Sequence, residues 1–137
     1  MPLGHIGVNV TDLGQAKAYY DQFMPLVDYE PFFAVEDQFS YLPANQKRGT
    51  WVFFYEAAEP TDYSRQRPGL QHLAFMVDTR RAVDEAHEWA IAAGSEILHA
   101  PREFPEYHEG YYATFWLDPE GFMLEIVCHQ DKNQDAG

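Results

Sequence analysis

The stretch HIGVNVTD at residues 5–12 recurs as HLAFMVDT at residues 72–79, and this repeat decides the fold. In both copies apolar residues alternate with other types, which is typical of a strand that packs one face against a helix layer. The apolar rows are Ile6, Val8 and Val10 in the first copy and Leu73, Phe75 and Val77 in the second. Each copy opens with a histidine on the opposite row, so His5 and His72 are expected at matching positions on matching faces.

A helix is predicted after each of these strands. Thr11 or Asp12 can cap a helix that ends before Pro25, and Thr79 can cap a second one that stops at Gly94. Short strands then follow in both halves, at residues 29–33, 39–42 and 50–56 and at residues 95–99, 111–117 and 122–128. The sequence therefore predicts an α+β fold of two β-α-β-β-β modules.

The predicted organisation is a single domain over residues 1–137, consisting of module one (3–56), a linker (57–69), module two (70–128) and a polar tail (129–137). The linker is indicated by two prolines, one glycine and no periodicity. A long loop is expected at residues 100–110, and loops of that length in a compact domain are often functional. The tail from Gln130 onward is expected to be frayed.

Charge and composition exclude several classes of partner. The chain has 9 Lys and Arg against 22 Asp and Glu, a net charge of −13, and so acidic a surface repels nucleic-acid phosphates and anionic lipids. Its single cysteine, Cys128, cannot form an intrachain disulfide, and no apolar run approaches the roughly 18 residues of a membrane span. We therefore expect a cytoplasmic protein. Aromatic residues are 16% of the chain, more than core filling needs, which indicates a small-molecule cavity.

The duplicated module with a histidine opening each half, together with the hairpin DPEGFMLEIV at residues 118–127, resembles the vicinal oxygen chelate superfamily. That superfamily groups glyoxalase I, methylmalonyl-CoA epimerase, fosfomycin and bleomycin resistance proteins, and extradiol dioxygenases. The resemblance covers residues 3–128, and the run YHEGYYA at residues 107–113 is similar to that of glyoxalase-like proteins. It implies two curled, mixed half-barrel sheets around a cavity, with the helices on the outer face.

The resemblance also implies that His5, His72 and Glu125 hold a divalent metal, one of Zn, Fe, Mn, Ni or Co. The alternation supports this, because Leu124 and Ile126 form the helix-facing row and Glu125 therefore projects to the other face. A carboxylate within an apolar strand needs a partner, and two imidazoles with one carboxylate suit such metals. The alternative for a single residue is an ordinary contact, a backbone carbonyl for His5 or an arginine for Glu125. The remaining histidines without a predicted role are interpreted as surface residues: His87, His99 and His129.

The sequence leaves open whether a fourth side chain binds the metal. Glyoxalase I usually supplies a further carboxylate from the last strand of the first half, here residues 50–56. If Val52 and Phe54 face the helix, Glu56 does not face the cavity, but a phase slip of one residue would bring it in. The residues expected to contact substrate are Trp51, Phe53, Tyr107, Tyr112 and Met123, and those expected to transfer protons are His108 and Tyr55. Tyr111 is expected only to close the pocket.

The function that this resemblance favours is a glyoxalase-like metalloenzyme, in which the metal chelates vicinal oxygens of a small neutral or aromatic substrate. Lyase, isomerase and dioxygenase chemistry all remain open. The alternative is a metal-free protein that sequesters an aromatic or cationic compound, as bleomycin resistance proteins do; a third class is a structural interaction module. We expect a homodimer, because an isolated half-barrel would leave a large apolar face in water.

Overall fold

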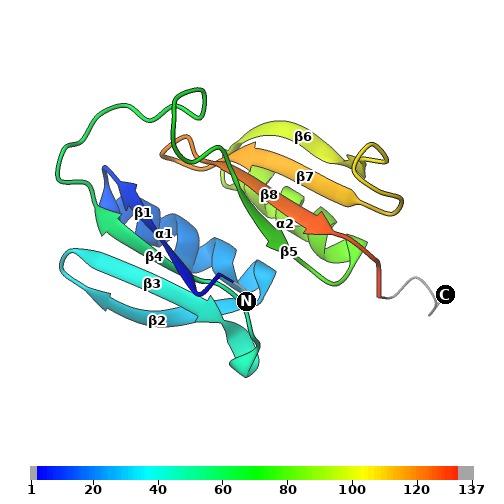
Figure 1. The fold of residues 1–137 in the computed structure, drawn as a ribbon, viewed down its shortest axis with the longest axis horizontal. Coiled ribbons are helices and arrows are strands. Elements are labelled where there is room, and N and C mark those ends of the chain that lie inside the picture. The colour runs from blue at the N-terminus through cyan, green and yellow to red at the C-terminus, as the bar shows by residue number, and fades with distance from the viewer. Residues whose placement is uncertain (1–2, 133–137) are drawn as a thin grey trace. The chain divides into compact units, whose positions relative to one another are not determined.

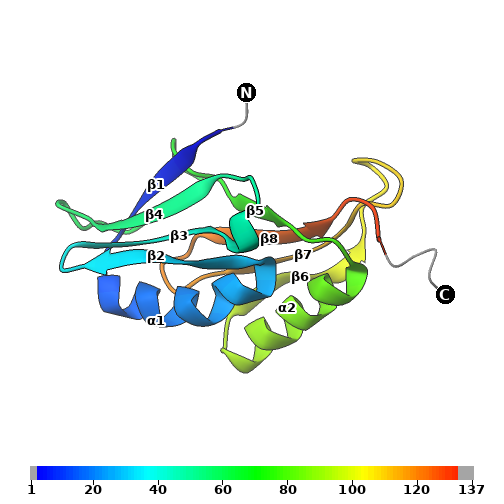
Figure 2. The ribbon, with the colours of Figure 1, turned by 90° about the horizontal axis from the view of Figure 1, so that it is seen from below.

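The computed structural model describes residues 3–132, which form two compact units divided between Asp62 and Tyr63. Each unit contains one four-stranded mixed sheet, and in each an α-helix covers one face of that sheet (Figures 1 and 2). The two sheets are open rather than closed into barrels. The predicted α+β class and the repeated β-α-β-β-β order are confirmed.

The first unit carries a sheet of order β1-β4-β3-β2, in which β1 runs parallel to β4 and the other pairs are antiparallel. Its elements are β1 (His5–Val10), α1 (Leu13–Phe23), a 3-10 turn (Met24–Val27), β2 (Tyr29–Val35), β3 (Gln38–Pro43), a second 3-10 turn (Ala44–Gln46) and β4 (Trp51–Glu56). Asp12 caps α1 by accepting a hydrogen bond from the backbone N–H of Gln15 at 2.9 Å. The helix then buries Tyr20 and Phe23, and the Tyr20 ring lies 4.4 Å from that of Phe54 on β4.

The second unit repeats this plan, with sheet order β5-β8-β7-β6 and β5 parallel to β8. Its elements are β5 (Leu73–Met76), α2 (Arg80–Ala92), β6 (Glu96–Glu103), β7 (Tyr112–Leu117) and β8 (Met123–Cys128). The hydroxyl of Thr79 caps α2 by accepting from the N–H of Ala82 at 3.0 Å. Gly94 follows the helix with φ of 80°, a conformation that glycine adopts without strain.

The turn between β7 and β8 is built around the buried side chain of Asp118. Its Oδ1 accepts hydrogen bonds from the backbone N–H groups of Glu120, Gly121 and Phe122, at 2.9, 3.0 and 2.9 Å. Gly121 has φ of 99°, so the predicted use of glycine in this hairpin is confirmed.

Strand β6 is longer than predicted. It continues to Glu103, so the expected loop at residues 100–110 begins only at residue 104. The strand includes the proline at position 101, and β6 is an edge strand with irregular pairing between Ile97 and His99 and between His99 and Arg102. Edges and bulges are the places where a sheet tolerates proline.

The beginning of the polar tail is held rather than frayed. The backbone N–H of Lys132 donates to the carbonyl of Asp78 at 2.9 Å, and the Lys132 ammonium lies 3.2 Å from the Asp78 carboxylate. The rest of the predicted tail, residues 133–137, lies outside the described residues. Within residues 3–132, no helix is both long enough and apolar enough to cross a membrane.

Candidate active site

The carboxylate of Glu125 is buried in the middle of β8, where its residue is only 3% exposed. Its neighbours Leu124 and Ile126 are fully buried on the face that packs against α2, so alternation turns Glu125 to the opposite face, as predicted. There Ala74 of β5 and Phe115 of β7 are its register partners. A carboxylate in this central position is far from water and needs polar partners within the protein.

Both oxygens of Glu125 have such partners. Nε2 of His72 lies 3.1 Å from Oε1, and the hydroxyl of Tyr111 donates a hydrogen bond to Oε2. The other ring nitrogen of His72, Nδ1, lies 2.5 Å from the side-chain oxygen of Gln71, which fixes the plane of the ring. The histidine side chain is 36% exposed, so the pair connects a buried acid to the surface.

The pair lies at a cavity of about 390 Å³ on the face of the second sheet away from α2. Four of the residues expected from the sequence to take part in a site line it together: His72, Tyr107, Met123 and Glu125. Tyr111, which is expected from the sequence only to close the pocket, also lines the cavity. The remaining lining residues have no role expected from the sequence: Gln71, His99, Phe104 and Phe115. The cavity therefore combines one buried acid and two imidazoles with walls that are largely aromatic.

The aromatic walls are held by the segment that connects β6 to β7. The N–H of Phe104 donates to the carbonyl of Tyr111 at 2.8 Å, and the N–H of Tyr107 donates to the carbonyl of Phe104 at 3.0 Å. The ring of Phe104 lies 5.5 Å from Phe115 and is stacked with Tyr107 at 5.9 Å, measured between centroids. Tyr107 itself is 63% exposed, so it forms the rim of the cavity rather than its floor.

Tyr111 is the functional candidate that the sequence analysis undervalued. It was expected only to close the pocket, but its hydroxyl bonds to Glu125. Burial, followed by the hydrogen bond to Glu125, raises the pKa of Tyr111 above its ordinary value. Tyr111 shares one face with residues 113 and 115, but both rows of this stretch carry aromatic residues, so the sequence leaves its phase open. His99 is exposed, as predicted for a surface residue, and its ring also packs edge-on against Phe115 at 5.5 Å in the cavity wall.

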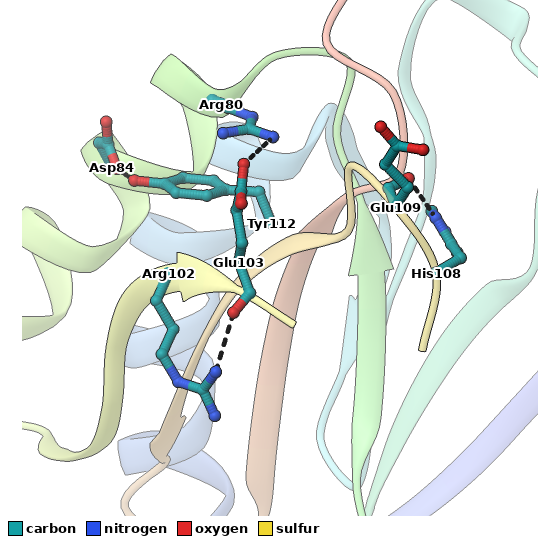
Figure 3. A network of polar contacts seen from close by, with 7 residues as sticks. All are labelled: Arg80, Asp84, Arg102, Glu103, His108, Glu109 and Tyr112. Carbon is teal, nitrogen blue, oxygen red and sulfur yellow. Dashed lines mark hydrogen bonds and ion pairs between the residues drawn. The ribbon is translucent and has the colours of Figure 1, made fainter. Parts of the chain in front are cut away.

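Tyr112 lies on the face of the sheet that carries α2 and does not line the cavity, contrary to the expectation that it contacts substrate. Figure 3 shows its side chain beside Asp84 and Arg80. Its hydroxyl donates to the carboxylate of Asp84 on α2 at 2.7 Å, and the guanidinium of Arg80 lies 4.8 Å from the centre of its ring. Burial, then the hydrogen bond to Asp84, raises the pKa of Tyr112 to about 12. The misplacement is a phase error of one residue at the start of β7.

His108 does not line the cavity of Glu125 either, although it was expected to transfer protons there. Its Nδ1 lies 2.8 Å from the backbone carbonyl of Glu109, as Figure 3 shows, and its Nε2 lies 2.9 Å from Nδ1 of His129. The ring contacts Tyr111 at 5.2 Å, so Tyr111 contacts His108 as well as Glu125. His108 therefore forms a pair with His129 outside the cavity of Glu125.

In the first unit, His5 opens β1 with Trp51 of β4 as its register partner. The predicted phase of β4 is confirmed: Val52 and Phe54 are buried, while Trp51, Phe53 and Tyr55 are half-buried on the other row. The ring of Phe53 lies 5.4 Å from that of His5.

Glu56 is exposed and projects from the same face of β4 as Val52 and Phe54. His5 shares the other face with its register partner Trp51, so Glu56 does not lie beside it. Within residues 3–132, the structure contains no group of three His, Cys, Asp or Glu side chains that could hold a metal ion. His72 and Glu125 are brought together as a pair in the second unit, and His5 belongs to the first.

Comparison with known proteins places this arrangement in a family. Residues 3–126 match the sequence profile of the Glyoxalase/Bleomycin resistance protein/Dioxygenase superfamily. The uncharacterized protein YqjT of Bacillus subtilis is 29% identical over 127 residues, which are 90% of this chain and 96% of that protein.

Solved structures agree with the family match. A candidate glyoxalase from Bacillus halodurans has a TM-score of 0.76 and 27% identity, covering 92% of this chain and 94% of that one. The fosfomycin resistance protein FosX of Listeria monocytogenes, at 21% identity and a TM-score of 0.67 over 93% of each chain, shows the shared fold. Because the profile match covers nearly the whole chain and the fold agrees with it, this protein belongs to the glyoxalase, bleomycin resistance protein and dioxygenase superfamily.

Proposed function

We propose that this protein is a metal-dependent enzyme of the glyoxalase-like type, acting on a small neutral or aromatic substrate that carries two adjacent oxygens. The observation that carries the proposal is the buried Glu125 carboxylate, joined to His72 at 3.1 Å in an aromatic cavity. A purely structural strand has no need of a carboxylate in this position, because an apolar side chain would cost less to bury.

The donor atoms suit a divalent metal. One imidazole nitrogen and one carboxylate oxygen already converge at 3.1 Å, and metal binding requires that neither atom carries a proton. His5 of the first unit would be the third ligand, and Glu56 is not included because it lies on the other face of its strand from His5. A bound metal would supply Lewis-acid activation of the substrate's paired oxygens.

The residues of the chain itself would bind and orient the substrate. Phe104, Phe115 and Met123 offer apolar surface beside Glu125, and Tyr107 covers the rim. Tyr111 would orient the carboxylate through its hydrogen bond, in the way that outer partners commonly fix metal ligands. Trp51, Phe53 and Tyr55 of the first unit would provide further aromatic contacts, with Tyr55 as the proposed proton-transfer group of that unit.

Metal analysis of purified protein tests this proposal. After incubation with Zn, Mn, Ni, Co or anaerobic Fe, wild-type protein should hold one of these metals stoichiometrically at His5, His72 and Glu125, and His72→Ala and Glu125→Gln should each abolish that binding. His87→Gln is the matched control, since His87 lies on α2 outside the cavity. The proposal fails if wild-type and His72→Ala proteins bind every metal equally.

A second candidate is favoured by the aromatic walls, namely a protein that sequesters an aromatic or cationic compound without metal. Net charge of −13 attracts cations, and aromatic faces bind them. An aromatic ligand found by screening should distinguish the two. It binds equally to wild-type, His72→Ala and metal-stripped protein if the chain only sequesters it, whereas the enzyme loses turnover in His72→Ala. A homodimer and a cytoplasmic location belong to both proposals.

A further inference from the structure

A second pair of imidazoles converges outside the cavity of Glu125. His108 lies in the segment between β6 and β7, and His129 directly follows β8. Nε2 of His108 is 2.9 Å from Nδ1 of His129, and the two rings are stacked with centroids 5.2 Å apart and planes inclined at 24°. Both residues are exposed, so neither contact is forced by burial in the core.

The tautomer of His108 follows from its other nitrogen. Nδ1 lies 2.8 Å from the carbonyl oxygen of Glu109, and a carbonyl can only accept, so Nδ1 carries the proton. Nε2 of neutral His108 therefore presents its lone pair to His129. This is the arrangement in which metal-binding histidines are usually found, with one nitrogen fixed by a backbone carbonyl and the other free to coordinate.

The backbone is shaped to bring these two rings together. Gly110 has φ of 89°, a left-handed conformation that glycine adopts without strain. Glycine therefore allows the turn that carries His108 past the backbone of His129. The ring of Tyr111 packs against both imidazoles, with centroids 5.2 Å from His108 and 5.1 Å from His129.

The cavity around the two histidines is acidic. His108 and His129 line a cavity of about 700 Å³ to which Glu109 and Asp131 also contribute. Arg80 is the only basic side chain among the described residues that line it, apart from the imidazoles, and its guanidinium is already paired with Glu103 at 2.9 Å. The field at this site therefore favours a cation rather than an anion.

We propose that His108 and His129 form a second divalent metal site, distinct from the pair of His72 and Glu125. The ligands are Nε2 of His108 and Nδ1 of His129, with water completing the coordination. His129 binds in the tautomer that carries its proton on Nε2, so the ring stays neutral. A metal here fastens the segment with Tyr111 to the end of β8, and so steadies the residue that donates to Glu125.

Zinc binding by the full chain tests this site, with the His72→Ala variant used to remove the first one. Competition with a chromophoric chelator near neutral pH should show one Zn(II) bound per chain in His72→Ala. Adding His108→Gln or His129→Gln should weaken that binding by about tenfold or more, whereas adding His87→Gln should leave it unchanged. Zn(II) should also shift the ring-proton NMR signals of both His108 and His129. Circular dichroism checks that each variant is folded.

Two results would overturn the proposal. One is that His72→Ala binds no Zn(II), which would mean that the two histidines only share a proton. The other is that the double variants bind Zn(II) as tightly as His72→Ala alone. A different result is expected if the proposed site of His5, His72 and Glu125 binds no metal. Wild-type and His72→Ala proteins would then bind the same amount of metal.

Discussion

Removing the hydroxyl of Tyr111 should destabilise the second unit measurably. In Tyr111→Phe, Oε2 of Glu125 loses its donor while the carboxylate stays 3% exposed. A hydrogen bond to a charged group contributes about 1.5–3 kcal/mol. Since Tyr111 is half-buried and water can reach its edge, we expect the lower part of that range, about 1.5–2 kcal/mol. Tyr107→Phe is the matched control, because Tyr107 is exposed at the rim and should change the free energy of unfolding by less than about 0.5 kcal/mol.

Urea denaturation of metal-free protein measures this cost, with fluorescence from Trp89 and Trp116 of the second unit as the signal. Glu125→Gln completes a double-mutant cycle. In that background the lost bond is one between neutral groups, so Tyr111→Phe should cost only about 0.5–1.5 kcal/mol. The reasoning is refuted if Tyr111→Phe and Tyr107→Phe cost the same, or if Glu125→Gln leaves the cost of Tyr111→Phe unchanged.

Four further outcomes are expected. The pKa of Tyr112 is raised from 10.0 to about 12, so the stability that its hydroxyl contributes is complete below pH 10 and is lost as pH rises toward 12. Urea denaturation should show that Tyr112→Phe flattens the dependence of stability on pH between pH 10 and about 12. Asp118→Ala should cost about 2–3 kcal/mol, because the N–H groups of Glu120 and Phe122 lose their acceptor while that of Gly121 keeps the Asp118 carbonyl. Glu120→Ala, measured in the same way, should cost far less. Trp51→Ala should weaken binding of an aromatic ligand by about 1–3 kcal/mol in calorimetry without changing metal content. Sedimentation should show a dimer at micromolar concentration, and a monomer would contradict that expectation.

Alternation along strands was the part of the structure that the sequence predicted best. The pattern of β4 and β8 placed Phe54 and Leu124 toward the helices and Glu125 away from them, and the structure agrees. Alternate residues of a strand point to opposite faces, so a strand with only one buried face shows a single apolar row that identifies this face. Helix limits were also predicted well, because Asp12 and Thr79 cap through their own side chains.

The errors came where no buried row fixed the phase or where contacts join distant segments. At the start of β7 two tyrosines follow one another, and composition alone could not decide which of Tyr111 and Tyr112 faces Glu125. The contact between His108 and His129 links residues on either side of the final hairpin, and nothing local to either histidine predicts it. The strand predicted to end at residue 99 continues through Pro101, and the edge position that tolerates this proline is not visible in the sequence.

The parallel pairing at the edge of each sheet has a consequence for folding. Strands β1 and β5 are edge strands, each held by a single ladder to the last strand of its own unit. Neither can dock until the rest of its module has formed, because that ladder closes the longest loop in the unit. These strands should be the last to join and the first to open, with backbone amides that exchange with solvent faster than those of β4 and β8. Each of these edges carries a histidine, His5 within β1 and His72 directly before β5. Both histidines would then reach their native positions only in the final stage of folding.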